Sequence, residues 1–117
     1  MVKTTIYHNP RCSTSRRTLA ILKERGVDLD VVRYLEDPPS VAELDSLCRK
    51  LGIEPVRLMR TKEKRFAELG LSVKDDRPRK EWLTLMAENP ILIERPVVVR
   101  RGKAAIGRPP ESVLEIL

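Results

Sequence analysis

The sequence predicts an α/β fold with a mixed four-stranded sheet, in the order β-α-β, helical insertion, β-β-α. Three observations predict it: two short apolar segments flank a helical pattern near the N-terminus, the middle is helical, and a second pair of apolar segments follows near the C-terminus. A chain of 117 residues can bury a core without disulfides or metals. We therefore expect a single domain over residues 1–117, with the helical insertion at about 40–90.

The N-terminal part has the pattern of a β-α-β unit. A strand is predicted over Thr4–Tyr7, and Asn9-Pro10 is a turn signal after it. The leucine spacing and a stop at Gly26 predict a helix over Ser13–Arg25, and the valine-rich segment Leu29–Tyr34 predicts a second strand. Two strands joined by a crossover helix are expected to lie parallel.

The middle of the chain predicts several helices and no convincing strand. Ser40 and Glu43 form a capping box, and a helix follows whose apolar positions are Val41, Leu44, Leu47 and Leu51. Shorter helices are predicted over Pro55–Met59, Arg65–Leu69 and Lys80–Ala87. These segments make up the expected insertion.

The C-terminal part predicts a hairpin and a last helix. Val97–Val99 and Lys103–Ile106 are apolar segments on either side of Arg101-Gly102. A final helix is predicted from Pro109-Pro110 to Leu117. This order of elements is that of a thioredoxin-like fold.

Composition disfavours two classes of partner. The formal net charge is +6, but only 3% of residues are aromatic and the basic residues are scattered, which disfavours nucleic-acid binding. The chain has no long apolar segment and no signal-peptide pattern, and two distant cysteines form no disulfide framework. We therefore expect a cytoplasmic protein with reduced thiols and no membrane association. A monomer is the expected oligomeric state, although composition does not determine it.

The two cysteines have different sequence environments. Cys48 lies on the apolar face of the capped helix, one turn from Leu44, which is typical of core packing. Cys12 lies among polar residues at the start of a predicted helix, where the helix dipole and unpaired N–H groups favour a thiolate. Cys12 is therefore the candidate nucleophile.

Two neighbours of Cys12 are further candidates. His8, the only histidine, could assist the thiolate as a proton donor or acceptor, or could be a hydrogen-bonded residue at a strand end. The hydroxyl of Ser15 could hydrogen-bond the thiolate or cap the helix. One histidine and two distant cysteines do not make a recognisable metal site, so no metal is expected.

Spacing around Cys12 excludes two thiol chemistries. A phosphatase-type loop needs an arginine six positions after the cysteine, where this chain has Thr18, and a dithiol centre needs a second cysteine where this chain has Ser15. A monothiol centre remains, which must take its second thiol from outside, and glutathione or a small redox protein is the expected source.

Five segments together resemble the glutaredoxin-coupled arsenate reductases over essentially the whole chain. They are YHNPRCSTSRRTL, RYLEDPPS, LMR, ERPVVV and IGRPPESVLEIL, in the family's order and spacing. The resemblance implies a thioredoxin-like fold with a helical insertion. It also implies reduction of arsenate to arsenite with electrons from glutathione and glutaredoxin, with glutathione as co-substrate and no bound cofactor.

The resemblance also implies roles for particular residues. The family's nucleophile falls on Cys12, positions thought to assist the thiolate fall on His8 and Ser15, and the oxyanion-binding arginines fall on Arg60, Arg95 and Arg108. Guanidinium groups suit a tetrahedral oxyanion because they form paired, charge-assisted hydrogen bonds. The resemblance further implies that Arg95-Pro96 is a cis peptide bond.

Two other functions stay open at the level of sequence. A glutathione-dependent thiol-disulfide oxidoreductase of the same fold would need Cys12 but not Arg60 or Arg108. A non-enzymatic regulator like the Spx proteins, which bind RNA polymerase, would share the fold, but those proteins typically carry a Cys-x-x-Cys switch that this chain lacks.

Overall fold

The computed structural model describes residues 2–117 and divides into two compact units. The first unit is formed by residues 2–37 together with 95–117, and the second by Pro38–Glu94. The second unit corresponds to the insertion expected at about 40–90. That the whole chain behaves as a single domain stays a prediction, which one cooperative thermal transition would support.

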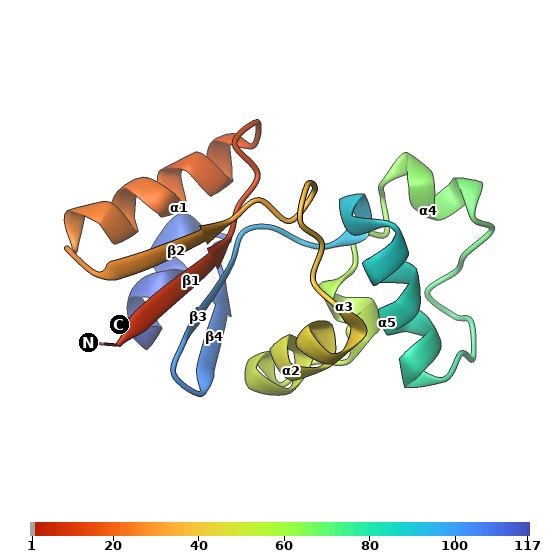
Figure 1. Ribbon diagram of the computed structural model, residues 1–117. Helices are drawn as coiled ribbons and strands as arrows, with labels where there is room; N and C mark the ends of the chain where they lie inside the picture. The colour runs from red at the N-terminus through yellow and green to blue at the C-terminus, as the bar shows by residue number, and fades with distance from the viewer. Residues whose placement is uncertain (1) are drawn as a thin grey trace. The chain divides into compact units, whose positions relative to one another are not determined.

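The first unit contains the whole sheet (Figure 1). Its elements are β1 (Lys3–Tyr7), α1 (Ser13–Glu24), β2 (Asp28–Val32), β3 (Val97–Arg100), β4 (Lys103–Ile106) and the 3₁₀ helix η2 (Pro110–Ile116). The strand order is β2-β1-β3-β4; β1 and β2 are parallel, and β3 is antiparallel to both β1 and β4. The predicted thioredoxin-like α/β fold with a mixed four-stranded sheet is confirmed.

One face of this sheet is covered by α1 and η2. Ile6 of β1 and Val98 of β3 are register partners, and they form a fully buried cluster with Leu22 of α1 and Val113 of η2. The alternation of side chains along a strand puts both sheet residues on the same face. The helical pattern around Leu22 is therefore explained by burial against the two central strands.

Most predicted ends lie within one residue of those observed, and two elements differ by more than that or in helix type. The second strand ends at Val32 rather than Tyr34, because the N–H groups of Glu36 and Asp37 both bond to the carbonyl of Arg33 and turn the chain. The last helix is a 3₁₀ helix rather than an α-helix, with a bond from the N–H of Ser112 to the carbonyl of Pro109. Side chains three apart align in such a helix, which turns Val113 and Ile116 toward the core.

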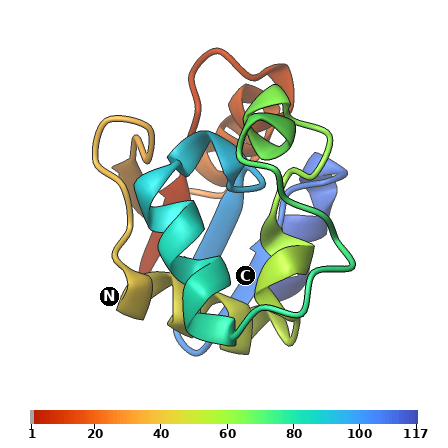
Figure 2. The same cartoon turned by 90° about the vertical axis from the view of Figure 1, so that its right-hand side faces the viewer.

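The second unit is helical, as predicted (Figure 2). Its elements are α2 (Val41–Leu51), α3 (Pro55–Leu58), α4 (Lys64–Glu68), α5 (Arg79–Glu88) and the 3₁₀ helix η1 (Pro90–Leu92). The predicted capping box is present: Ser40 Oγ accepts from the N–H of Glu43 at 3.1 Å, and Glu43 Oε1 accepts from the N–H of Ser40 at 3.2 Å. Cys48 is fully buried, as predicted, and burial raises the pKa of its thiol.

A short antiparallel bridge ties two segments of the second unit together. Met59 pairs with Ile93, the N–H of Arg60 bonds to the carbonyl of Leu92 at 2.7 Å, and the N–H of Glu94 bonds to the carbonyl of Leu58 at 2.8 Å. The carbonyl of Arg60 accepts from the N–H of Glu63 at 3.1 Å, so both polar backbone groups of Arg60 are hydrogen-bonded. Over residues 2–117, no helix combines the length and the apolar character needed to cross a membrane.

Candidate active site

Cys12 lies at the junction between the loop that follows β1 and the first turn of α1. It is the N-cap residue of α1, and its carbonyl accepts from the N–H of Arg16 at 3.0 Å. Its own N–H donates to the carbonyl of Asn9 at 3.0 Å, and its side chain is half-buried. The sulfur therefore lies at the N-terminal end of a twelve-residue helix, where N–H groups are available to a thiolate.

Asn9 organises this loop, although the sequence indicated only a turn there. Its Oδ1 accepts from the N–H of Arg11 at 3.0 Å, which is an Asx turn, and its N–H donates to Ser15 Oγ at 3.1 Å. With the bond from Cys12, three hydrogen bonds join Asn9 to the loop and to α1. The Asn-Pro dipeptide is the sequence signal for this role.

His8 and Ser15 are brought together, but the Ser15 hydroxyl does not play either role expected for it. Ser15 Oγ lies 2.7 Å from His8 Nδ1 and accepts from Asn9, and both side chains are buried. The part of Ser15 that faces the Cys12 sulfur is its backbone N–H. Desolvation by burial, followed by the charges of Arg33, Lys23 and Arg16, lowers the pKa of His8, so the imidazole is neutral at pH 7.

The environment of Cys12 favours its thiolate. Burial alone would raise the pKa of the thiol, but the N–H of Ser15, the charge of Arg95, the N–H of Thr14 and a hydrogen bond from Arg95 together outweigh it, and the net pKa is lowered. The structure therefore brings helix N–H groups and Arg95 together around this sulfur.

Arg95 and Arg108 reach Cys12 from the far end of the sequence. Arg108 Nη2 lies 3.7 Å from Cys12 Sγ, and Arg108 Nε donates to the carbonyl of Arg95 at 2.8 Å, so the two arginines are linked. The Arg95-Pro96 bond is cis, as the resemblance implied, and Arg108-Pro109 is cis as well. These contacts place two cations at the sulfur.

Gly107 holds the segment before Arg108 close to α1. Its N–H donates to the carbonyl of Pro96 at 2.9 Å. A Cβ atom at this position would lie 2.6 Å from Thr18 Oγ1 and 2.8 Å from Pro96 Cγ, too close for any side chain. Sequence reasoning did not assign this role to Gly107, because it depends on a contact between segments far apart in the chain.

Arg60 belongs to the second unit. Its Nη1 forms an ion pair with Glu63 Oε2 at 2.7 Å, and both side chains are about three-quarters buried, with 27% and 22% exposed. With its backbone tied to Leu92, the guanidinium has a defined position within that unit. Among residues 2–117, no group of three or more metal-ligating side chains is gathered at one place.

Replacing Arg95 with glutamine is expected to raise the pKa of Cys12. The charge and the hydrogen bond of Arg95 both favour the thiolate, so their loss lowers the thiolate fraction near neutral pH. The pH dependence of the iodoacetamide alkylation rate measures this, and its midpoint should move to higher pH. Arg25→Gln, at the other end of α1, is the control, and an equal shift in both variants would contradict the prediction.

The stability of the fold is expected to fall in acid because of His8. Its pKa is 6.5 in the unfolded chain and lower in the folded protein, so the unfolded state binds more protons below pH 6.5. The free energy of unfolding should therefore be largest above that value and decrease as pH falls through it toward the folded pKa. Urea unfolding between about pH 5 and pH 7.5 measures this, and His8→Asn should show a weaker dependence. An unchanged dependence in His8→Asn would assign the effect to other groups.

Comparisons with known proteins cover nearly the whole chain. The model of the ArsC family matches residues 7–116, which include all six candidate site residues. In Escherichia coli K12, the Uncharacterized protein YfgD is 54% identical over 96% of this chain and 94% of its own length. The arsenate reductase of Haemophilus influenzae is 49% identical, with 96% of this chain and 97% of that protein covered. The solved structure of the arsenate reductase from Vibrio cholerae has a TM-score of 0.93 at 50% identity, over 99% of this chain and 98% of that one.

Proposed function

The chain belongs to the ArsC family, and from this premise we propose that it reduces arsenate to arsenite with the Cys12 thiolate as nucleophile. The observation that carries the proposal is the convergence of helix N–H groups, Arg95 and Arg108 on one sulfur of lowered pKa. A thiolate surrounded by N–H groups and cations suits attack on a tetrahedral oxyanion, because the groups that stabilise the thiolate also attract the anion.

The proposed reaction needs two electrons from external thiols. Attack of Cys12 on arsenic forms an S–As bond and releases hydroxide, and a glutathione thiolate then forms a second S–As bond with loss of another hydroxide. When a glutaredoxin thiolate attacks the glutathione sulfur, an S–S bond forms and the electron pair of that As–S bond stays on arsenic. Arsenic(V) becomes arsenic(III), and hydrolysis of the remaining S–As bond releases arsenite and Cys12.

The three arginines are proposed to bind the oxyanion. Arg95 and Arg108 contact the sulfur and each other, and would hold oxygens of arsenate next to it. Arg60 is proposed as the third, carried by the second unit and held by Glu63. His8 and Ser15 are proposed to support the loop through their hydrogen bond. Because the lowered pKa of His8 keeps its imidazole neutral, it is not proposed as a proton donor.

The proposal includes a cytoplasmic monomer that uses glutathione as its co-substrate. Cys12 and Cys48 are both free thiols and Cys48 is fully buried, so the proposed chemistry at Cys12 needs a reducing compartment and a supply of small thiols. Arsenate, glutathione and glutaredoxin are the proposed partners, and no resident cofactor is needed for this cycle.

Replacing Arg60 with alanine tests the proposed arsenate site. The expected result is a fall in kcat/KM for arsenate of roughly 10- to 100-fold, as for loss of a hydrogen bond to a charged group. Arsenate-dependent NADPH oxidation with glutathione, glutathione reductase and glutaredoxin measures it. Arg57→Ala is the matched control, an exposed arginine of the same unit.

The outcomes separate the candidate functions. Turnover in the wild type that Arg57→Ala retains and Arg60→Ala loses supports an arsenate reductase with an arginine-lined site. Absence of arsenate-dependent turnover in the folded wild type, with Cys12 reduced, would contradict the proposal and favour a thiol-disulfide oxidoreductase.

A further inference from the structure

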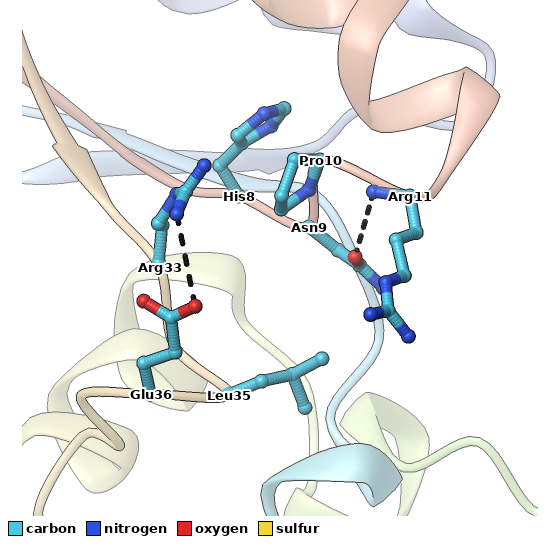
Figure 3. Close-up of a pocket in the computed structure, with 7 residues that line it drawn as sticks. All are labelled: His8, Asn9, Pro10, Arg11, Arg33, Leu35 and Glu36. Atoms are coloured by element: carbon cyan, nitrogen blue, oxygen red, sulfur yellow. Dashed lines mark hydrogen bonds and ion pairs between the residues drawn. The ribbon is translucent and has the colours of Figure 1, made fainter.

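A pocket of about 260 Å³ opens beside the Cys12 loop, and the proposed function leaves it unassigned (Figure 3). One wall is formed by the loop residues 8–11, and the other by Arg33, Leu35 and Glu36 in the turn that follows β2. All of these residues belong to the first unit. The pocket is therefore a property of the sheet unit and its nucleophile loop.

The pocket and Cys12 share the same loop. The N–H of His8 donates to the carbonyl of Val32 at 2.8 Å. The backbone that leads into Arg33 therefore lies one strand spacing, about 4.8 Å, from the backbone of the loop. At the other end, the carbonyl of Asn9 accepts from the N–H of Cys12. A ligand in this pocket therefore lies against the same loop segment whose end carries Cys12.

The charges of the pocket match an amino-acid zwitterion. Arg33 Nη1 and Glu36 Oε1 lie 3.7 Å apart, and these side chains are 56% and 71% exposed, so neither is committed to a buried pair. An α-carboxylate can bind the guanidinium while the neighbouring α-ammonium binds the carboxylate. Arg11 on the opposite wall offers a cation for a second carboxylate, and Leu35 gives the wall of Arg33 and Glu36 an apolar side chain (Figure 3).

We propose that this pocket binds the α-amino-acid end of a small peptide thiol, the class to which glutathione belongs. A γ-glutamyl peptide thiol carries two carboxylates and one ammonium, against two guanidinium groups and one carboxylate here. Its thiol lies between the charged ends, and could approach Cys12 along the shared loop. The assignment rests on the proposed use of such a thiol as co-substrate, and it adds where that co-substrate binds.

The test uses thiol-disulfide exchange and needs no arsenate. The Cys12 thiolate attacks one sulfur of oxidised glutathione, the S–S bond breaks, a Cys12–glutathione disulfide forms, and one glutathione thiolate leaves. The same rate is measured with hydroxyethyl disulfide, which carries no charged groups. Mass spectrometry follows the adduct in the wild type, Arg33→Ala, Arg33→Glu and the control Arg25→Ala, an exposed arginine at the far end of α1.

The expected result is that the Arg33 variants react more slowly with oxidised glutathione but not with hydroxyethyl disulfide. Arg33→Ala should slow the reaction with oxidised glutathione about fivefold, the size typical of an exposed ion pair, and Arg33→Glu should slow it further. The rate with hydroxyethyl disulfide should stay within about twofold, because it reports the reactivity of Cys12 itself. Arg25→Ala should match the wild type with both disulfides.

Two results would overturn the assignment. Equal slowing with both disulfides would mean that Arg33 acts on the thiolate through its charge, and no slowing with either would mean that the pocket binds no zwitterion. Selective slowing in the Arg33 variants, together with a wild type that does not turn over arsenate, would contradict the proposed function and leave the pocket assignment standing.

Discussion

Replacing Cys12 with serine is expected to abolish arsenate reduction, with turnover at least about a thousandfold below the wild type. The proposed reaction begins with an S–As bond, and a serine hydroxyl at the same position is not ionised near neutral pH. The surrounding N–H groups and Arg95 lower the pKa of a thiol from an ordinary value of 9.0, but an alcohol starts far above that range. Coupled NADPH oxidation measures the loss.

Cys48 provides the matched control for this substitution. It is the other cysteine of the chain, fully buried on α2, and burial raises the pKa of its thiol. Cys48→Ala should keep the turnover of the folded protein while lowering stability modestly, because a small core side chain is shortened. Activity retained in Cys12→Ser would remove the nucleophile from the proposed mechanism, and activity lost in folded Cys48→Ala would show that both thiols take part.

Replacing Gly107 with alanine is expected to lower both stability and activity. The new Cβ would lie 2.6 Å from Thr18 Oγ1 and 2.8 Å from Pro96 Cγ, so the backbone must move. Overpacking of this kind costs about 1–3 kcal/mol in the free energy of unfolding. Because Arg108 follows directly and lies 3.7 Å from Cys12 Sγ, the same movement should weaken its contact and raise the pKa of the thiol. Urea unfolding and the pH dependence of alkylation measure the two effects.

Gly102 and Thr18 make this prediction specific. A Cβ at Gly102 would meet no atom within 4 Å, so Gly102→Ala should leave both measurements nearly unchanged. Adding Thr18→Ala to Gly107→Ala removes two of the three close contacts and should recover part of the stability. If Gly107→Ala and Gly102→Ala behave alike, close packing at Gly107 has no role in placing Arg108.

Local patterns predicted the elements that local interactions determine. The capping box at Ser40 and Glu43 and the buried face of α2 follow from spacing along one helix, and both are present. Cys12 could be singled out because the helix that follows it is visible in the sequence. The mixed sheet could be inferred because short connections restrict which strands can be parallel.

The remaining features depend on contacts between distant segments. The need for glycine at position 107 arises from Thr18 and Pro96, neither of which is its neighbour in sequence. The partners of the Ser15 hydroxyl depend on how the loop closes over His8, and the position of Arg33 beside that loop depends on the pairing of β2 with β1. A pattern along one segment carries no information about such pairs.

The two arginines at Cys12 have a consequence for the newly made chain. Cys12 and its helix leave the ribosome before Arg95 and Arg108, which are made only after the whole helical unit. Until β3 and β4 pair and bring these two flanking residues to the sulfur, the N–H groups of its own helix are left to stabilise a negative charge there. During synthesis the thiol is therefore less prone to oxidation or to reaction with stray electrophiles than in the finished protein. Full reactivity of Cys12 depends on completed folding, so the chemistry of this one side chain reports that the sheet has formed.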